Sequence, residues 1–226
     1  MKFRSRSSVS SVLVAGLVGA LLPVLASAPA SAATITARDL LSGLTVASES
    51  NGSTYLRSAF KTWIDADGDC QDTRAEVLIA ESLVTPTYTS SSHCTVATGK
   101  WLSYYDGATW TAPSDVDIDH MVPLKEAWVS GAAGWSANDR QRYANDLDFF
   151  ADLVAVTDSV NQAKGDKDPA EWLPPSTAAT CTYATEWVQV KYRWRLSMDS
   201  AESAALSSIL TGTCGSKTTV VPARAI

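Results

Sequence analysis

The sequence is poor in the residues from which most metal and nucleophile sites are built. It contains two histidines, His93 and His120, and four cysteines, none of which is spaced as CxxC. It also lacks HExxH and GxSxG motifs, which argues against zinc peptidases and serine hydrolases. A zinc site formed by cysteine and histidine is therefore not favoured.

Basic residues are also few, because 18 lysines and arginines stand against 24 aspartates and glutamates, which gives a net charge of −6. Proteins that bind nucleic acid through bulk electrostatics are usually basic. A nucleic-acid partner would therefore require either a local concentration of positive charge or a cation that screens the carboxylates from phosphate.

Long apolar runs are rare, and the one that stands out lies between Val12 and Leu25. Three basic residues precede it, and the small residues Ala30-Ser31-Ala32 follow it as a cleavage pattern. This order is typical of a secretory signal peptide. We expect residues 1–32 to be removed and residues 33–226 to form a single secreted, extracellular domain, monomeric and without a membrane segment. Removal of the leader would shift the net charge to −9.

All four cysteines lie in the expected mature chain, where an even number predicts two disulfides. Four cysteines can form two disulfides in three different pairings. The pairing between neighbours in the sequence is favoured, which joins Cys70 to Cys94 and Cys181 to Cys214.

The periodicity of apolar residues predicts a mixed α+β domain that contains more helix than strand. Asp106-Gly107 lies between two aromatic, β-favouring runs and predicts a hairpin over residues 95–111. Apolar alternation predicts strands at 115–120 and 153–156. Helices are expected at 37–44, 55–63, 74–82, 124–130, 138–150, 159–164, 186–196 and 199–210.

An acidic loop runs from Asp65 to Asp72, with carboxylates that alternate around Gly68. The loop resembles a small calcium-binding loop, although we interpret it as lacking the glutamate that closes an EF-hand. Asp65, Asp67 and Asp69 are the candidate ligands of a structural Ca²⁺. The alternative is a turn held only by its disulfide.

The residues that indicate chemistry are Asp119 and His120, which end the first predicted strand, and Asn161, which lies on the helix after the second. Phosphodiester hydrolysis requires a base that deprotonates water and a divalent ion that holds phosphate. A neutral imidazole suits the base, because its pKa lies near the working pH. A carboxylate and an amide oxygen suit a hard cation such as Mg²⁺.

The motifs around these residues resemble the HNH endonuclease superfamily. They are closest to the branch found in secreted actinobacterial proteins and in the C-terminal part of GmrSD-type modification-dependent restriction enzymes. The secreted members also resemble this chain in residues 67–74 and 181–191, which extends the resemblance to nearly the whole mature chain. The motifs are Asp119-His120-Met121-Val122-Pro123-Leu124, Ala127-Trp128, Ser130-Gly131-Ala132, Tyr143-Ala144-Asn145-Asp146, Asn161, Lys164-Gly165-Asp166 and residues 169–174.

This resemblance implies a ββα-metal core over about 115–172, embedded in additional helices and stabilised by disulfides. It implies that His120 is the general base and that Asp119 and Asn161 hold a divalent ion. Mg²⁺ is the expected ion, with Mn²⁺ and Ca²⁺ as alternatives. Lys164, one turn after Asn161 on the same helical face, is expected to reach a phosphate. Arg74 is a weaker candidate for a phosphate contact.

The sequence departs from the family at the residue that orients the base, which is usually an asparagine just before the second strand. Asp152 takes this position here, and its carboxylate could accept the imidazole N–H. Asn145 is the alternative if the strand register is shifted. We therefore retain both residues as candidates.

Two classes of function follow from these features. The first is a secreted, metal-dependent endonuclease that cleaves DNA, with RNA as an alternative, and has little sequence preference. The second is a non-catalytic, calcium-stabilised binding or cell-wall-associated protein that retains the fold. The acidic loop, the acidic net charge and the presence of Asp152 support the second class.

Overall fold

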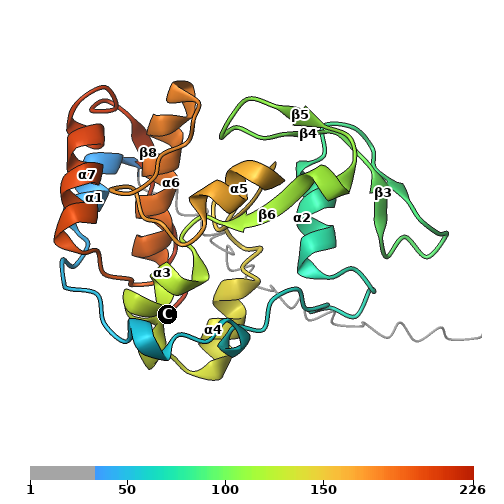
Figure 1. Ribbon diagram of the computed structural model, residues 1–226, viewed down its shortest axis with the longest axis horizontal. Coiled ribbons are helices and arrows are strands. Elements are labelled where there is room, and N and C mark those ends of the chain that lie inside the picture. Colours follow the sequence, from blue (N-terminus) through green and yellow to red (C-terminus); the bar gives the residue numbers. More distant parts are fainter. Residues whose placement is uncertain (1–33) are drawn as a thin grey trace, which may run out of the picture. The chain divides into compact units, whose positions relative to one another are not determined.

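The computed structural model describes residues 34–226 (Figure 1). The expected signal peptide and its cleavage point lie outside these described residues. Within them, no helix is both long enough and apolar enough to cross a membrane.

The described chain combines helices with short strands, as its apolar periodicity predicts. The helices are α1 (Ala37–Ser42), α2 (Thr73–Glu81), α3 (Leu124–Val129), α4 (Ala137–Ala144), α5 (Asp158–Lys164), α6 (Thr180–Arg193) and α7 (Ser200–Thr211). The strands are β1 (Thr34–Thr36), β2 (Thr87–Tyr88), β3 (Val96–Thr98), β4 (Trp101–Leu102), β5 (Thr109–Trp110), β6 (Val116–His120), β7 (Leu153–Thr157) and β8 (Thr218–Val220).

The strands form antiparallel pairs rather than one sheet. The pairs are β1 with β8, β2 with β3, β4 with β5, and β6 with β7. A two-stranded ribbon is only marginally stable in water, so each pair depends on packing against other elements. The pair β6–β7 receives most of this support, because all five residues of β7 are buried.

The pair β6–β7 lies between two hydrophobic clusters, and its alternating side chains belong to both. Val154 and Val156 belong to the larger cluster, to which α1, α6 and α7 also contribute. Leu153 and Ala155 belong to the smaller cluster, in which Leu78 of α2 and Trp101 of β4 take part. Figure 1 shows β6 between α5 and α2. Burial on both faces explains why β7 is a continuous apolar run.

The ends of the helices follow from local sequence. Asp72, Ser136 and Asp199 cap α2, α4 and α7, each by accepting a backbone N–H with its side chain. Helix α5 ends at Gly165, whose φ of 56° lies in the left-handed region that favours glycine.

Both predicted disulfides are confirmed. Cys70 is joined to Cys94, and Cys181 to Cys214, with Cα–Cα distances of 5.1 and 5.4 Å. The first ties the acidic loop to the segment before β3, and the second ties the start of α6 to the chain that follows α7.

Three predicted helices differ from the structure. Helix α6 begins at Thr180, six residues before the predicted start at 186. Residues 55–63 form no α-helix, because Tyr55 and Phe60 instead pack edge-on against Trp128, and 3₁₀ turns occupy Gly52–Thr54 and Arg57–Ala59. Helix α4 ends at Ala144 rather than near residue 150. Here the side-chain amide of Asn145 donates to the carbonyl of Gln141 at 2.7 Å and ends the helical hydrogen bonding.

Glu81 makes the stability of this fold dependent on pH. Its carboxylate accepts the N–H of Ala155 in β7 at 2.9 Å. Burial raises the pKa of Glu81 from 4.5 to about 7, although the Ala155 N–H opposes this. The folded state therefore holds the proton more tightly than the unfolded chain. The free energy of unfolding should decrease as the pH rises from about 4.5 to about 7, and Glu81 should contribute roughly 3 kcal/mol of this decrease at most.

Urea unfolding at several pH values tests this expectation. Glu81→Gln keeps an oxygen for the Ala155 N–H but does not titrate, so the stability of this variant should fall less steeply. Glu171→Gln, which removes an exposed carboxylate, is the matched control and should retain the wild-type slope. Equal slopes for all three proteins would contradict the assignment to Glu81.

Candidate active site

Strands β6 and β7 and helix α5 bring the candidate residues together. In the antiparallel register, Asp119 lies opposite Val154 and His120 opposite Leu153, so both polar residues lie at the end of the ribbon. Helix α5 follows β7 directly and packs against both strands. This local order places Asn161 beside the end of β6.

A cavity of about 200 Å³ lies at this place. Asp119 and His120 from β6 and Asn161 from α5 line it, so three of the predicted site residues share one cavity. Arg57, from the 3₁₀ turn before the acidic loop, lines it as well.

Two side chains bind one oxygen of the Asp119 carboxylate. Its Oδ2 accepts hydrogen bonds from the hydroxyl of Tyr105 at 2.7 Å and from the ammonium of Lys164 at 2.6 Å. Its Oδ1 accepts no hydrogen bond from the described residues. Burial raises the pKa of Asp119, but the Lys164 ammonium and the Tyr105 hydroxyl oppose this shift. One carboxylate oxygen is thus fixed within the protein, and the other remains available on a side chain that lines the cavity.

Lys164 does not have the position expected of a phosphate contact. Its side chain is 0% exposed, and its ammonium donates to Asp119 Oδ2 and to the carbonyls of His120 and Met121, at 2.6, 2.9 and 3.0 Å. A lysine ammonium has three donors, so all of them are used. The expectation of a phosphate contact is corrected: Lys164 positions Asp119 and the end of β6.

Asn161 is oriented by a second carboxylate on β6. Its side-chain amide donates to Oδ2 of Asp117 at 3.1 Å. The amide oxygen of Asn161 accepts no hydrogen bond from the described residues, so it remains available as a ligand on a side chain that lines the cavity. Asp117 and Asp119 lie two residues apart on β6, which places both on the face that α5 covers.

The imidazole of His120 is fixed by a backbone carbonyl. Its Nε2 lies 3.1 Å from the carbonyl oxygen of Ala144, which can only accept, so Nε2 carries the proton. Nδ1 is therefore the basic nitrogen. Burial lowers the pKa of His120 to about 4, the hydrogen bond to Ala144 opposes this, and the charges of Arg57 and Lys164 add to it. The pKa of His120 is therefore lower than the value near the working pH that the sequence interpretation assumed, although the imidazole is neutral as expected. The ring lies between Trp63 and Tyr143, with stacked centroids at 5.6 and 6.3 Å.

Neither candidate for the orienting residue contacts the imidazole. Asp152 is buried, and its carboxylate lies 3.4 Å from Nε of Arg193. Its pKa is raised well above the usual value by burial and by the charge of Asp146. Asp152 is therefore part of a buried charged cluster, and the expectation that it orients His120 is corrected. Asn145 acts only indirectly, because it follows Ala144 and its amide donates to the carbonyl of Lys61 at 2.5 Å.

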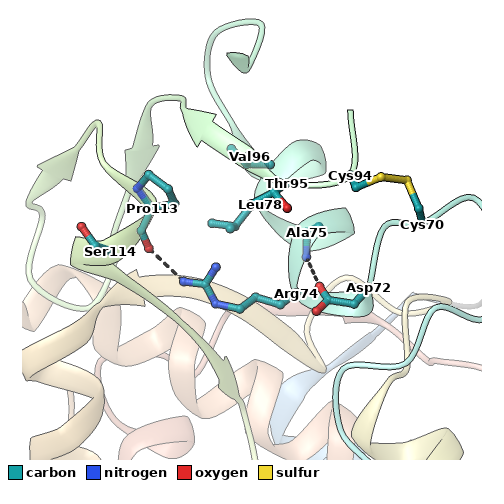
Figure 2. Close-up of a pocket in the computed structure, with 10 residues that line it drawn as sticks. All are labelled: Cys70, Asp72, Arg74, Ala75, Leu78, Cys94, Thr95, Val96, Pro113 and Ser114. Atoms are coloured by element: carbon teal, nitrogen blue, oxygen red, sulfur yellow. Dashed lines mark hydrogen bonds between the residues drawn. A yellow bond between two sulfur atoms is a disulfide. The ribbon is translucent and has the colours of Figure 1, made fainter. Parts of the chain in front are cut away.

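The sequence indicated Arg74 as a phosphate contact and gave no indication that Arg57 contributes to the site. Figure 2 shows Arg74 reaching from α2 to the carbonyl of Pro113, and its guanidinium also donates to Val116, at 2.8 and 2.9 Å. Arg74 thus holds the start of β6 and does not line the cavity with His120. Arg57 does so, but nothing in the local sequence indicates it, since folding alone brings it to the site.

The comparisons with known proteins identify the family. Residues 72–209, more than half of the chain, match the family described as GmrSD restriction endonucleases, C-terminal domain. The chain belongs to this family. The GmrSD C-terminal domain match includes Asp119, His120 and Asn161 and leaves out Arg57.

One relative extends the similarity beyond the GmrSD C-terminal domain. A protein of the fungus Arthroderma benhamiae, described as an uncharacterized secreted protein, is 50% identical over 179 residues, which cover 79% of this chain and 85% of that protein. The protein is secreted, in agreement with its two disulfides. The relative is fungal, so the actinobacterial branch rests on the sequence motifs alone. No solved structure matches the chain.

The buried position of Lys164 predicts a large effect on stability. Lys164→Met should lower the free energy of unfolding by about 3–5 kcal/mol, because it leaves the carboxylate of Asp119 buried without its cation. Lys167→Met removes an exposed ammonium that donates to the Ala163 carbonyl, and should cost about 0.5 kcal/mol or less. Urea unfolding of both variants provides the measurement. A loss for Lys164→Met as small as that for Lys167→Met would contradict the positioning role.

Proposed function

We propose that this protein is a metal-dependent endonuclease that hydrolyses phosphodiester bonds in DNA, with RNA as an alternative substrate. The observation that carries the proposal is that three residues line one cavity, each with a nitrogen or oxygen atom that makes no hydrogen bond with the described residues. These atoms are the Nδ1 of a neutral His120, one carboxylate oxygen of Asp119 and the amide oxygen of Asn161. The family supports a nuclease, since its name describes restriction endonucleases.

His120 acts as the general base in this proposal. A base needs an unprotonated nitrogen directed at water, and the Ala144 carbonyl leaves Nδ1 in that state by taking the Nε2 proton. The stacked rings of Trp63 and Tyr143 limit rotation of the imidazole. His120 can therefore accept a proton from water without first losing one of its own.

Asp119 and Asn161 are the proposed ligands of the divalent ion. A carboxylate oxygen and an amide oxygen are hard donors, and Mg²⁺ binds with few protein ligands while it keeps several waters. Such an ion, when bound, supplies positive charge to a non-bridging phosphate oxygen and to the leaving oxygen. Lys164 and Tyr105 direct the free oxygen of Asp119 to the cavity by binding the other one. In this interpretation β6, β7 and α5 form a ββα-metal core.

Arg57 supplies positive charge at the wall of the cavity. Its side chain is exposed and makes no ion pair among the described residues, so its donors are available for a phosphate. A guanidinium can bind phosphate through two parallel hydrogen bonds. This local positive charge reduces the electrostatic repulsion between an acidic chain and an anionic nucleic acid. Contacts of this kind carry no sequence information, in line with low sequence preference.

A plasmid-nicking assay with Mg²⁺, Mn²⁺ or Ca²⁺ tests the activity. His120→Ala should reduce the cleavage rate by about 10²–10⁴-fold, since it removes the base. The other histidine provides a matched control, because His93 is exposed and stacks on Tyr88 at 4.4 Å. His93→Ala should retain wild-type activity, and EDTA should abolish it. Full activity of His120→Ala would contradict the mechanism. Absence of cleavage by the wild type on DNA and RNA with every ion would favour the non-catalytic binding protein.

The role of Arg57 has its own test. Arg57→Ala should lower kcat/KM by about tenfold to a hundredfold, because it removes a charged donor to the phosphate. Arg57→Lys should recover part of this loss, since it retains the charge but not the paired donors. Arg38→Ala, which removes an exposed arginine of α1, is the control for net charge. Equal kcat/KM values for Arg57→Ala and Arg38→Ala would remove Arg57 from the site.

A further inference from the structure

The acidic loop that precedes α2 gathers three carboxylates. One oxygen each from Asp65, Asp67 and Asp69 lies within 4.8 Å of the other two. No lysine or arginine forms an ion pair with these aspartates among the described residues. A cluster of this kind is common on protein surfaces, so by itself it does not identify a site.

Glu76 supplies a second, independent observation. Its Oε2 atom is buried and accepts no hydrogen bond among the described residues. The rest of Glu76 is only partly buried, so this oxygen is open to a water molecule or an ion as its partner. Burial raises the pKa of Glu76, and the charges of Asp67, Asp69 and Asp65 raise it further, so the loop aspartates act electrostatically on this carboxyl.

The spacing of these residues matches a calcium loop. With Asp65 as the first residue, Asp67 and Asp69 take positions 3 and 5, and Glu76 takes position 12, where an EF-hand has its bidentate glutamate. The sequence interpretation that this glutamate is missing was therefore wrong. The residue at position 12 is Glu76, the same residue whose Oε2 atom lacks a partner.

The sixth position agrees with the same pattern. An EF-hand has a glycine there for a sharp turn. Cys70 occupies this position with a φ of 77°, in the left-handed region, and its N–H donates to Oδ2 of Asp65 at 3.0 Å. The disulfide to Cys94, shown in Figure 2, anchors the same residue.

We propose that the loop Asp65–Glu76 binds Ca²⁺ through Asp65, Asp67, Asp69, the carbonyl of Gln71 and Glu76. Ca²⁺ takes six to eight oxygen ligands, more than Mg²⁺ accepts from protein side chains. Thr73, at position 9, is not assigned as a direct ligand: its side chain is buried against the Asn145 side-chain oxygen and the Ile64 carbonyl, which share its one hydroxyl proton, and this position often binds the ion through water. Extracellular calcium modules bind with dissociation constants of about 10⁻⁴–10⁻³ M, which suits a secreted protein.

This ion would stabilise the segments that surround His120. Trp63, two residues before Asp65, stacks on the imidazole at 5.6 Å. Ile64 donates its N–H to Oδ1 of Asn145 at 3.2 Å, and Asn145 follows the residue whose carbonyl fixes His120. Calcium is thus assigned a structural role, separate from the ion proposed at Asp119 and Asn161.

Thermal unfolding of the secreted protein, first treated with EDTA, tests the proposal. Addition of Ca²⁺ to about 100-fold above its dissociation constant should raise the Tm by roughly 5–10 °C. Glu76→Gln removes one ligand charge with little change of shape and should lose most of this shift, and Asp67→Asn should do the same. Calorimetric titration with Ca²⁺ alone should show weaker binding by both variants. A wild-type shift in both would overturn the proposal, as would absence of a calcium-dependent shift in the wild type.

An Asn161→Ala variant separates this site from the proposed catalytic one. It should lose nuclease activity but retain the calcium-dependent rise in Tm. Glu171→Gln, which removes an exposed carboxylate outside both sites, should retain the rise as well. Loss of the rise in Asn161→Ala would assign the calcium effect to the cavity of His120 and overturn the loop site. An inactive wild type with an intact calcium shift would refute the nuclease and leave the loop site standing.

Discussion

The buried pair formed by Asp119 and Lys164 is the interaction on which the rest of the site depends. Two charges are removed from water here, and this is stable only because the ammonium satisfies three acceptors and the carboxylate has a second donor in Tyr105. The pair joins the end of α5 to the end of β6. It also decides which oxygen of Asp119 remains available, so the same contact that closes the core sets up the proposed metal site.

The second constraint is the choice of a carbonyl, rather than a carboxylate, as the partner of His120. A carboxylate at Nε2 would stabilise the imidazolium and raise the pKa of His120. The carbonyl of Ala144 fixes the same tautomer with a much weaker effect, and burial keeps the pKa of His120 at about 4. Asp152, which the sequence placed in this role, instead lies beside Arg193. The role of general base that we propose for His120 is consistent with this arrangement.

The sequence predicted the elements that depend on local patterns and missed the contacts that depend on tertiary packing. Alternation in β6 and β7 and the glycine after α5 predicted these elements, and the resemblance to the HNH superfamily implied that Asp119, His120 and Asn161 lie near one another. Helical spacing correctly put Lys164 on the face of Asn161, but it does not tell how deeply a side chain is buried. The Ala144 carbonyl was not predictable, because every residue has one. Arg57 lies in a segment whose predicted helix is absent, so its direction could not be inferred.

Because this secreted chain is acidic, the negative charge of its carboxylates is neutralised in different ways in the core, in the acidic loop and in the cavity of His120. In the core, Lys164 and Lys191 are fully buried cations, and Lys191 pairs with both Glu126 and Glu202 at 2.6 Å. Among the described residues, no lysine or arginine forms an ion pair with the aspartates of the acidic loop, and in the cavity of His120 the Lys164 ammonium binds only one oxygen of Asp119. These are the two places where we propose an external divalent ion. Asn145 connects them, because its side-chain oxygen receives hydrogen bonds from Thr73 of the loop and from Ile64 just before it, and its backbone follows Ala144. An ion in the loop is therefore expected to act on the geometry of the base and not on the chemistry of the phosphate.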